Sequence, residues 1–407
     1  MNAEVIAIGD ELTSGLRLDT NTQWLSQRLG DLGIRVLFHT TVGDDLDANV
    51  RVFREAFDRA NIIVSTGGLG PTADDLTRDA VAEASGTVLE LNEEVLSHIE
   101  SMFARRQRPM PRQNVVQAKF PTGSRVIQNP HGTAPGIDID VTHSRRSPSR
   151  LFALPGVPAE MREMWEETVA PALIDVLGEN RRFIRHRRIK CFGIGESDLE
   201  RMLPNLIRRG RQPSVGITVS RATITLRVTA EAESEAECYR AMEPTIATIH
   251  DCLGSLVFGE EDDELQHVVV RLLAEKKKTT SIAEWGTGAL AMQWLREVDI
   301  DNNHFIAGHT FSEKSVTGSK SLTSDKDLVG AFARQCRGQF DTDFGLAIGH
   351  IPTVDRQSSL SECVSIALAS PSDLLVKSFP LAGHPDIVNA RAAKQALNLL
   401  RHALLEC

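Results

Sequence analysis

The sequence predicts an α/β protein with three domains: a three-layer α/β/α N-terminal domain, a small α+β middle domain and an α/β C-terminal domain. First, 407 residues are too many for one ordinary core. Second, short β-branched runs alternate with amphipathic segments in the first part of the chain, which is typical of α/β winding. Third, this alternation changes in the middle and returns afterwards. We therefore expect domains at 1–178, 179–260 and 261–407.

The N-terminal domain is predicted from two kinds of segment that alternate along the chain. Short apolar runs, of the kind that form strands covered on both faces, stand at 3–8, 35–42, 61–66 and 150–154. Amphipathic helices are expected at 21–32, 48–59, 93–106 and 159–177. Because helices connect parallel strands, these segments predict an open, mostly parallel sheet.

The middle domain has a different order of elements. The expected elements are a strand at 187–192, a helix at 197–207, two strands across 214–229 and a helix at 233–253. Such units include RNA-binding KH domains, which need a Gly-x-x-Gly loop. This segment has only Gly193-Ile194-Gly195, so we favour a spacer or dimerisation role. The last domain begins with a helix near residue 263 and ends with a long helix at 388–405.

Composition and charge exclude several functional classes. The formal net charge of −10 argues against bulk nucleic-acid binding, which needs a basic face. The apolar runs are far shorter than the roughly 20 residues that span a bilayer, and the first residues do not read as a signal segment. We therefore expect a cytoplasmic protein without a membrane partner. The six cysteines form no C-x-x-C pair, so neither a zinc site nor a disulfide framework is indicated.

The segment 65–75 is the strongest local signal for a ligand site. It reads Ser-Thr-Gly-Gly-Leu-Gly-Pro-Thr-Ala-Asp-Asp and follows a predicted buried strand. Gly67, Gly68 and Gly70 let the chain turn sharply and expose backbone N–H groups to a phosphate. A helix is expected from about 74 to 84, so its first N–H groups would face the same place. Asp74 and Asp75 would then cap this helix, hold a divalent cation, or do both.

Two other predicted strands end in the same way. One continues into Gly9-Asp10-Glu11 and another into Gly43-Asp44-Asp45. Ligands of open α/β sheets bind at the carboxyl edge of the strands, so three such ends predict one site. Each turn taken alone has a structural interpretation, since an aspartate after a strand is commonly a helix cap. The glycine turn matches neither the dinucleotide fingerprint nor the P-loop.

Several motifs in order closely resemble the CinA family (competence/damage-inducible protein A). They are Gly9-Asp10-Glu11-Leu12, Thr20-Asn21, Val42-Gly43-Asp44-Asp45, the 66–75 segment with Thr77, Asn114 and Gln117, Asn129-Pro130, the 132–136 loop and Pro155-Gly156-Val157-Pro158. The resemblance implies a molybdopterin-binding-like N-terminal domain, a KH-like middle domain and a nicotinamide-nucleotide amidase domain at the end. In bacterial members the first domain is similar to a metal-dependent ADP-ribose pyrophosphatase.

With this resemblance, the N-terminal site takes a definite form as a hypothesis. The diphosphate would lie on the backbone amides of Gly67, Gly68, Gly70 and Thr72. Mg²⁺ or Co²⁺ would be held by Asp44 and Asp75, with Asp10 and Glu11 as further ligands or as the general base. The remaining expected contacts to the nucleotide are Asn21, Asn129, Gly132 and Thr133.

The C-terminal domain departs from the family at its expected catalytic residues. The family motif Ala-Glu-Ser-Cys-Thr-Gly-Gly carries the serine nucleophile, and here Trp285 stands in its place. An indole cannot form an acyl intermediate. Phe311 replaces the family's tyrosine, and the loop 348–353 also differs. We therefore expect no deamidation of nicotinamide mononucleotide and interpret the domain as a scaffold for oligomerisation or binding.

Other functions stay open at this point. The N-terminal domain could bind a nucleotide or a pterin phosphate without catalysis, since the same fold does so in cofactor-assembly proteins. The amidase could persist through a rearranged nucleophile such as Ser281 or Thr287. The exposed middle domain and the long terminal helix also suggest a homodimer.

Overall fold

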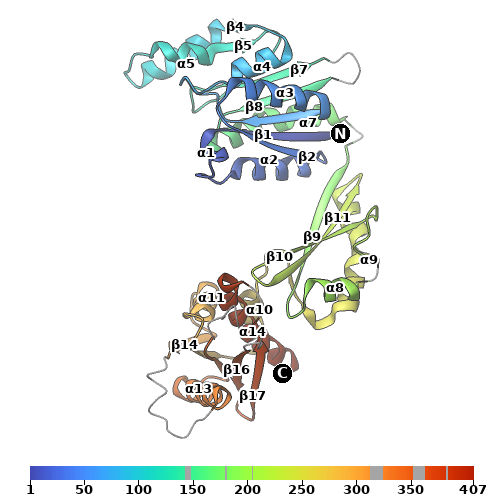
Figure 1. Cartoon of the computed structure of the whole chain (residues 1–407), viewed down its shortest axis with the longest axis vertical. Coiled ribbons are helices and arrows are strands. Elements are labelled where there is room, and N and C mark those ends of the chain that lie inside the picture. Colours follow the sequence, from blue (N-terminus) through green and yellow to red (C-terminus); the bar gives the residue numbers. More distant parts are fainter. Residues whose placement is uncertain (143–147, 179–180, 204, 312–323, 352–362, 382–383) are drawn as a thin grey trace, which may run out of the picture. The chain divides into compact units, whose positions relative to one another are not determined.

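The computed structural model describes residues 1–142, 148–178, 181–203, 205–311, 324–351, 363–381 and 384–407 (Figure 1). The chain divides into two compact units. The first comprises Met1–Arg185 and Glu231–Arg240, and the second comprises His186–Ala230 and Ala241–Cys407. The bounds of the three domains expected from the sequence stay a prediction.

The first unit is built around one mostly parallel sheet. Its strand order is β2-β1-β3-β8-β7-β6, in which β2, β1, β3 and β8 run parallel and β7 and β6 run antiparallel. The strands are β1 (Asn2–Ile8), β2 (Arg35–Val42), β3 (Ile62–Thr66), β6 (Arg125–Ile127), β7 (Gly136–Val141) and β8 (Ser149–Leu154), with β4 (Leu89–Leu91) and β5 (Lys119–Pro121) as a separate antiparallel pair. The register pairs Ile8 with Val42 and Ala7 with Thr66, so the carboxyl ends of three strands lie side by side.

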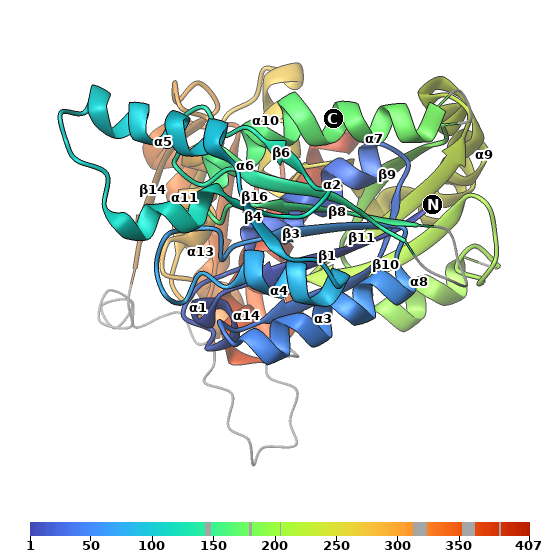
Figure 2. The ribbon, with the colours of Figure 1, turned by 90° about the horizontal axis from the view of Figure 1, so that it is seen from above.

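Helices cover both faces of this sheet and give the three-layer fold that the sequence predicts. They are α1 (Asp10–Thr13), α2 (Thr20–Asp31), α3 (Leu46–Arg59), α4 (Thr77–Ser85), α5 (Glu93–Arg105), η1 (Arg112–Ala118), α6 (Pro158–Met164), η2 (Trp165–Val169) and α7 (Ala170–Leu177). Figure 2 shows α3 and α4 on one side of β1, β3 and β8 and α7 on the other. Phe53 and Val81 pack into the core on the first side, and Leu25 and Leu173 on the second.

In the second unit, the middle part of the chain forms a sheet in the order β10-β11-β9-β12, in which β10 pairs antiparallel with β11 and β9 pairs antiparallel with β12. Its elements are β9 (Phe183–Cys191), α8 (Glu196–Met202), β10 (Ser214–Ser220), β11 (Thr223–Ala232), α9 (Glu235–Leu253), η4 (Gly254–Leu256) and β12 (Val257–Glu260). Strands β9 and β11 and helix α9 continue across the division between the two units. This order of strands and helices is the KH-like arrangement expected from the sequence.

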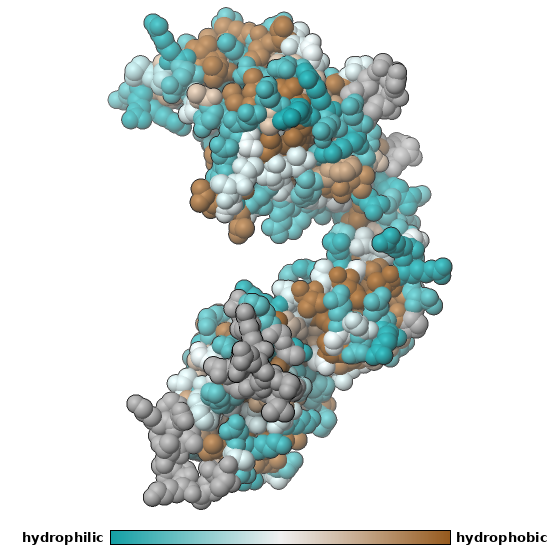
Figure 3. All heavy atoms as spheres, in the orientation of Figure 1, coloured by the Kyte–Doolittle hydropathy of each residue, from teal (hydrophilic) through white to brown (hydrophobic). Residues whose placement is uncertain are grey.

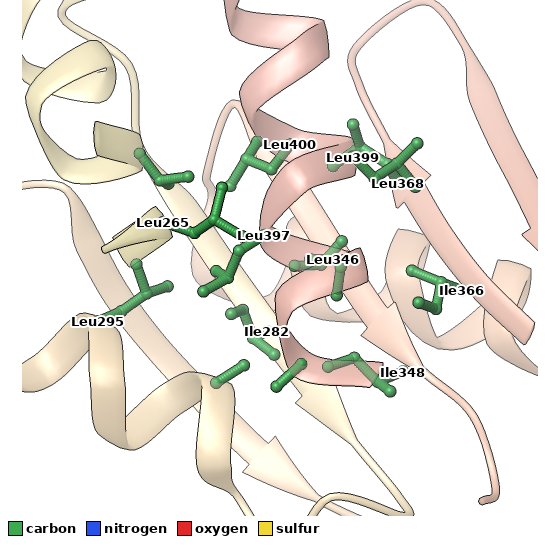
Figure 4. Close-up of a cluster of buried hydrophobic side chains, with 14 of the residues drawn as sticks. Leu265, Ile282, Leu295, Leu346, Ile348, Ile366, Leu368, Leu397, Leu399 and Leu400 are labelled. Carbon is green, nitrogen blue, oxygen red and sulfur yellow. The ribbon is translucent and has the colours of Figure 1, made fainter. Parts of the chain in front are cut away.

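The rest of the second unit is an α/β fold around the sheet β14-β13-β15-β16-β17. Its elements are α10 (Leu265–Lys276), β13 (Thr280–Glu284), α11 (Leu290–Val298), β14 (Phe305–Thr310), α13 (Asp325–Phe340), β15 (Phe344–Ile348), β16 (Cys363–Ala369), β17 (Leu374–Pro380) and α14 (Pro385–Glu406). Figure 4 shows Leu397 and Leu400 of α14 among Leu265, Ile282 and Leu346. The apolar side of the long terminal helix therefore packs within its own unit.

The surface mixes polar and apolar side chains, as Figure 3 shows for one face. Across the described ranges, the helices are all too short or too polar to cross a bilayer.

Candidate functional site: a cavity at the carboxyl edge of the first sheet

A cavity of about 480 Å³ lies where the parallel strands of the first unit end. Its walls come from the segments that follow β1, β2, β3 and β8, together with the 132–136 loop and the start of α6. The lining residues are Ile8, Gly9, Glu11, Arg17, Asp44, Gly67, Gly68, Leu69, Gly70, Asp74, Asp75, Ala134, Pro155, Gly156, Val157, Pro158 and Glu160. The structure thus brings Glu11, Asp44, Asp75 and the three glycines of the 67–70 loop around one space.

The carbonyl groups of the 67–70 loop bond to helix α4. Thr77 Oγ1 donates to Gly67 O at 2.8 Å, and Thr77 N donates to Gly68 O at 3.2 Å. Arg78 Nη1 donates to Leu69 O at 2.8 Å. The N–H groups of Gly68 and Leu69 donate no hydrogen bond to the described residues. These two amides in the cavity wall are therefore available to an anionic ligand.

Glycine is required in this loop for steric reasons. Gly67 has φ 108°, and a Cβ there would lie 2.2 Å from Ile8 O. A Cβ on Gly70 would lie 2.3 Å from Asp75 Oδ2. A side chain at either position would force the loop away from β1 or from Asp75.

Asp75 organises the loop that precedes it. Its Oδ1 accepts from Gly70 N at 2.7 Å, and its Oδ2 accepts from Thr72 N at 2.9 Å and from Thr72 Oγ1 at 2.5 Å. The expected helix start at Asp74 is wrong, because α4 begins at Thr77 and its N-cap Leu76 makes no side-chain cap. Asp75 therefore does not cap the helix, because its carboxylate bonds to the turn before it. Thr72 supports Asp75 and does not line the cavity.

Asp10 and Asp44 form a reciprocal pair between the ends of β1 and β2. Asp10 N donates to Asp44 Oδ2 at 2.9 Å, and Asp44 N donates to Asp10 Oδ1 at 3.0 Å. Burial raises the pKa of Asp44, and the charges of Asp10, Asp74 and Glu11 raise it further, against the lowering effect of the Asp10 amide. Asp10 is exposed and is not part of the cavity wall. Asp45, in contrast, caps α3 by accepting from Ala48 N at 2.8 Å.

The described part of the wall is strongly acidic. Five carboxylates against one guanidinium, that of Arg17, give it a formal charge of −4. A nucleotide diphosphate would be repelled unless cations accompanied it. The oxygen-only donors suit Mg²⁺, which keeps several waters and needs only one or two carboxylates plus substrate oxygens. The described residues contain no group of three or more His, Cys, Asp or Glu side chains placed to hold a metal by themselves.

Asn21 lies beside this cavity and not in its wall. It lines a small neighbouring space of about 30 Å³, together with Arg17, Thr66 and Gly156. Its Nδ2 donates to Thr66 Oγ1 at 3.1 Å and to Gly156 O at 3.0 Å. Asn21 thus holds the ends of β3 and β8 together.

Asn129 holds the 132–136 loop, the second loop of the site, in place. Its Oδ1 accepts from Gly132 N at 2.8 Å, and its Nδ2 donates to Ala134 O at 3.0 Å and to Glu160 Oε2 at 2.7 Å. Of the 132–136 loop, Ala134 lines the cavity, whereas Gly132 and Thr133 stand outside its wall. The structure therefore places Asn129 as a support for the loop and for Glu160.

Three residues of the site were not singled out from the sequence. Arg17 and Glu160 line the cavity, Arg17 from a segment without a distinctive pattern and Glu160 from a predicted helix in which nothing marked this residue as part of a site. Arg78 is 2% exposed and bonds to Leu69 O and, at 3.3 Å, to Pro135 O. Burial lowers the pKa of Arg78 to about 10. The glycine spacing predicted the 67–70 loop. No pattern in the sequence indicated that the guanidinium of Arg78 connects this loop to the 132–136 loop.

At the corresponding edge of the second unit, several of the described aromatic side chains contact one another. Trp285 follows β13, and its ring lies 5.6 Å from Phe311 and 5.3 Å from His350 by centroids. Phe311 stacks on Phe332 at 3.8 Å. Of the divergent family segments, residues 312 and 352–353 lie outside the described residues.

Glu284 is 1% exposed and accepts from Met292 N at 2.7 Å and from Thr287 Oγ1. Burial raises the pKa of Glu284, against the lowering effect of these hydrogen bonds. Ser281 is buried and exchanges a hydrogen bond with Thr342 at 2.8 Å. Both alternative nucleophiles, Ser281 and Thr287, are therefore buried and hydrogen-bonded.

Comparison with known proteins gives consistent matches. Residues 4–175 match the family described as "Probable molybdopterin binding domain", and residues 186–259 match "Damage-inducible protein CinA KH domain". A "CinA-like protein" of Dictyoglomus thermophilum is 34% identical over 100% of both chains, and one of Nostoc sp. is 35% identical over 100% of both. The crystal structure of the protein CinA from Thermoplasma acidophilum is 33% identical and covers 42% of this chain and 98% of its own, with a TM-score of 0.38.

Proposed function

The chain belongs to the CinA-like family, and from this membership we propose that its first unit hydrolyses the diphosphate bond of a nucleotide, most suitably ADP-ribose, in a metal-dependent reaction. The products would be AMP and ribose 5-phosphate. One observation carries the proposal: carboxylates and unbonded backbone amides from separate strand ends surround a single cavity of about 480 Å³.

The proposed reaction consumes one water molecule. Its oxygen forms a bond to one phosphorus, and the bond from that phosphorus to the bridging oxygen breaks. The water supplies OH to one phosphate and H to the other, so the reaction needs no other reactant. A bound divalent cation supplies positive charge to the phosphoryl oxygens and lowers the pKa of a water molecule.

The residues of the chain take distinct roles in this proposal. The N–H groups of Gly68 and Leu69 and the guanidinium of Arg17 would bind phosphate oxygens. Asp44 and Asp75 would hold Mg²⁺ or Co²⁺. Glu11 is the better candidate for the general base, because its exposed carboxylate lines the cavity whereas Asp10 is engaged with Asp44.

The direct test is to incubate the purified chain with ADP-ribose and Mg²⁺ or Co²⁺ and to identify the products. We expect AMP and ribose 5-phosphate in equal amounts, and none when the metal is chelated. Asp44→Asn should lower the turnover about 100-fold or more, since a metal-holding carboxylate is lost. Asp47→Asn is the matched control, because Asp47 is an exposed acid in the first turn of α3 outside the cavity. Equal turnover of both variants would contradict the proposal.

A second candidate is a protein that binds a nucleotide or pterin phosphate without hydrolysing it. Both carboxylate oxygens of Asp75 already accept hydrogen bonds within the loop, which favours binding without catalysis. The matching family is described as a probable molybdopterin binding domain, which also favours this candidate. Saturable binding of ADP-ribose without release of AMP, in the presence of either metal, would select this candidate.

For the second unit we propose that nicotinamide mononucleotide is not deamidated. Trp285 in place of a nucleophile, the aromatic rings around it and the buried hydroxyls of Ser281 and Thr287 support this. Ammonia released from this nucleotide by the full chain, above the level of Glu284→Ala, would contradict it.

We also propose a cytoplasmic homodimer without a nucleic-acid or membrane partner. The burial of the apolar side of α14 within its own unit leaves the middle part of the chain as the more suitable dimer surface. Analytical ultracentrifugation measures the assembly state, and a monomer at micromolar concentration would contradict the dimer.

A further inference from the structure

The second unit contains a positively charged cavity, whereas the cavity of the first unit is negatively charged. Its volume is about 250 Å³. It is lined by Lys190 of β9, the β10–β11 turn, the start of α10 and parts of α11 and α14. The lining residues are Lys190, Ser220, Arg221, Thr223, Thr225, Glu264, Gln266, Trp294 and Lys394.

The buried amine of Lys394 is the central feature. Its side chain is 5% exposed, and its Nζ donates to Thr223 Oγ1 at 2.5 Å and to Glu264 Oε2 at 3.0 Å. Burial lowers the pKa of Lys394; Glu264 opposes this, and the charges of Lys190 and Arg221 add to the lowering. An ammonium has three donors, and the described residues accept from two of those of Lys394, which leaves the third for a ligand.

Two more cations share this cavity with a single carboxylate. Lys190 Nζ lies 3.8 Å from Glu264 Oε1, so the same acid serves both ammonium groups. Arg221 makes no ion pair within the described residues. The described lining therefore carries a formal charge of +2, in a chain whose net charge is −10. Such a surplus of positive charge is balanced most directly by an anion.

The remaining lining residues fit an organic group attached to that anion. The hydroxyls of Thr223 and Thr225 are further hydrogen-bonding groups. Gln266 Oε1 is buried and has no hydrogen-bond partner in the described structure, so it can accept from a hydroxyl or an amine. Trp294 adds an aromatic surface.

We propose that this cavity binds a small phosphate-bearing metabolite, with its phosphate held by Lys190, Arg221 and Lys394. Three cations from separate elements suit a tetrahedral dianion better than a planar carboxylate. Because the cavity is itself positive, binding needs no divalent metal. This separates it from the acidic cavity of the first unit.

The test is a titration of the full chain with inorganic phosphate in the presence of EDTA. The reporter is the indole ¹⁵N–H resonance of Trp294, identified by its loss in Trp294→Phe. We expect a saturable shift of this resonance with phosphate, and a much weaker response to acetate at equal ionic strength. No shift, or an equal response to acetate, would overturn the proposal.

Arg221→Gln is the informative variant, since Arg221 is exposed whereas replacing the buried Lys394 endangers the fold. It should raise the phosphate concentration at half saturation about tenfold, as expected for the loss of one charged hydrogen-bonding partner. Arg227→Gln is the matched control, because Arg227 is exposed on the same strand β11 and does not line the cavity. An equal effect of the two variants would show general charge attraction and would overturn the assignment.

Discussion

In the first unit, the strands that end at Ile8, Val42 and Thr66 continue into glycine and acid, whereas in the second unit β13 ends at Glu284 and continues into Trp285. Both edges follow parallel strands. The first edge encloses about 480 Å³ lined by carboxylates and glycines, and at the second the rings of Trp285, Phe311 and His350 pack together. The strand layout is alike at the two edges, and the described residues just after the strands differ, with glycines and acids at the first and aromatic rings at the second.

The largest expected effect comes from filling the first edge. Gly156 lines the cavity, and a Cβ there would lie 3.6 Å from Gly67 Cα, an ordinary contact. Gly156→Trp should therefore reduce ADP-ribose hydrolysis to the uncatalysed level by occupying the ligand's space. Gly156→Ala is the control and should keep most of the turnover. If Gly156→Trp hydrolysed ADP-ribose normally, the cavity would not be the active site.

The converse change removes an aromatic ring from the edge of the second unit. Trp285→Ser removes a half-buried indole and should lower the free energy of unfolding of the second unit by about 3 kcal/mol. It should not create amidase activity, since Phe311 and the buried Glu284 stay in place. Urea denaturation measures the first effect and ammonia release the second. Ile300→Ser, at a 78% exposed residue of the same unit, should change the stability by no more than about 0.5 kcal/mol.

A smaller effect on stability and binding is expected where helix α4 bonds to the 67–70 loop of the first unit. Thr77 is fully buried and donates to Gly67 O, so Thr77→Val should cost about 1 kcal/mol of unfolding free energy and weaken ADP-ribose binding. Urea denaturation and a KM measurement check both consequences. Ser101→Ala removes an exposed hydroxyl of α5 and should change neither. A stable Thr77→Val variant with unchanged KM would show that this bond does not shape the loop.

The smallest effect concerns pH. Burial and then the charges of Asp10, Asp74 and Glu11 raise the pKa of Asp44, so its ionised form is lost at a higher pH than for an ordinary aspartate. The acid limb of kcat/KM should lie correspondingly high. Asp10→Asn removes one of these charges and should move this limb to lower pH, whereas Asp47→Asn should not. An upward movement in Asp10→Asn would contradict this account of Asp44.

The sequence predicted much of the fold and the acids of the first edge, because strand ends of a parallel sheet share one edge. It missed the start of α4, since nothing local indicates that Asp75 bonds back to Gly70 and Thr72. Arg17, in the segment between α1 and α2, and Glu160 of α6 reach the cavity only through the tertiary placement of these segments. Their contribution depends on distances between segments, which a local pattern does not contain.

Dependence on tertiary packing also explains what the sequence did not predict in the second unit. Trp285 in place of the family's serine predicted a lost nucleophile, but the stacking of Phe311 on Phe332 of α13 depends on how a distant helix packs. The cluster of cations around Lys394 has a similar origin, since its members come from β9, the β10–β11 turn and α14.

Arg78 joins two loops that are far apart in the sequence, since one guanidinium bonds to both Leu69 O and Pro135 O. Its Nε is buried and has no hydrogen-bond partner in the described structure, and the hydrogen bonds of the guanidinium to the two loops are those of Nη1 and Nη2. The two loops are thereby coupled through Arg78, and neither moves away without breaking its hydrogen bond to this guanidinium. A nucleotide that orders the glycine loop should therefore also slow amide hydrogen exchange around residues 132–136.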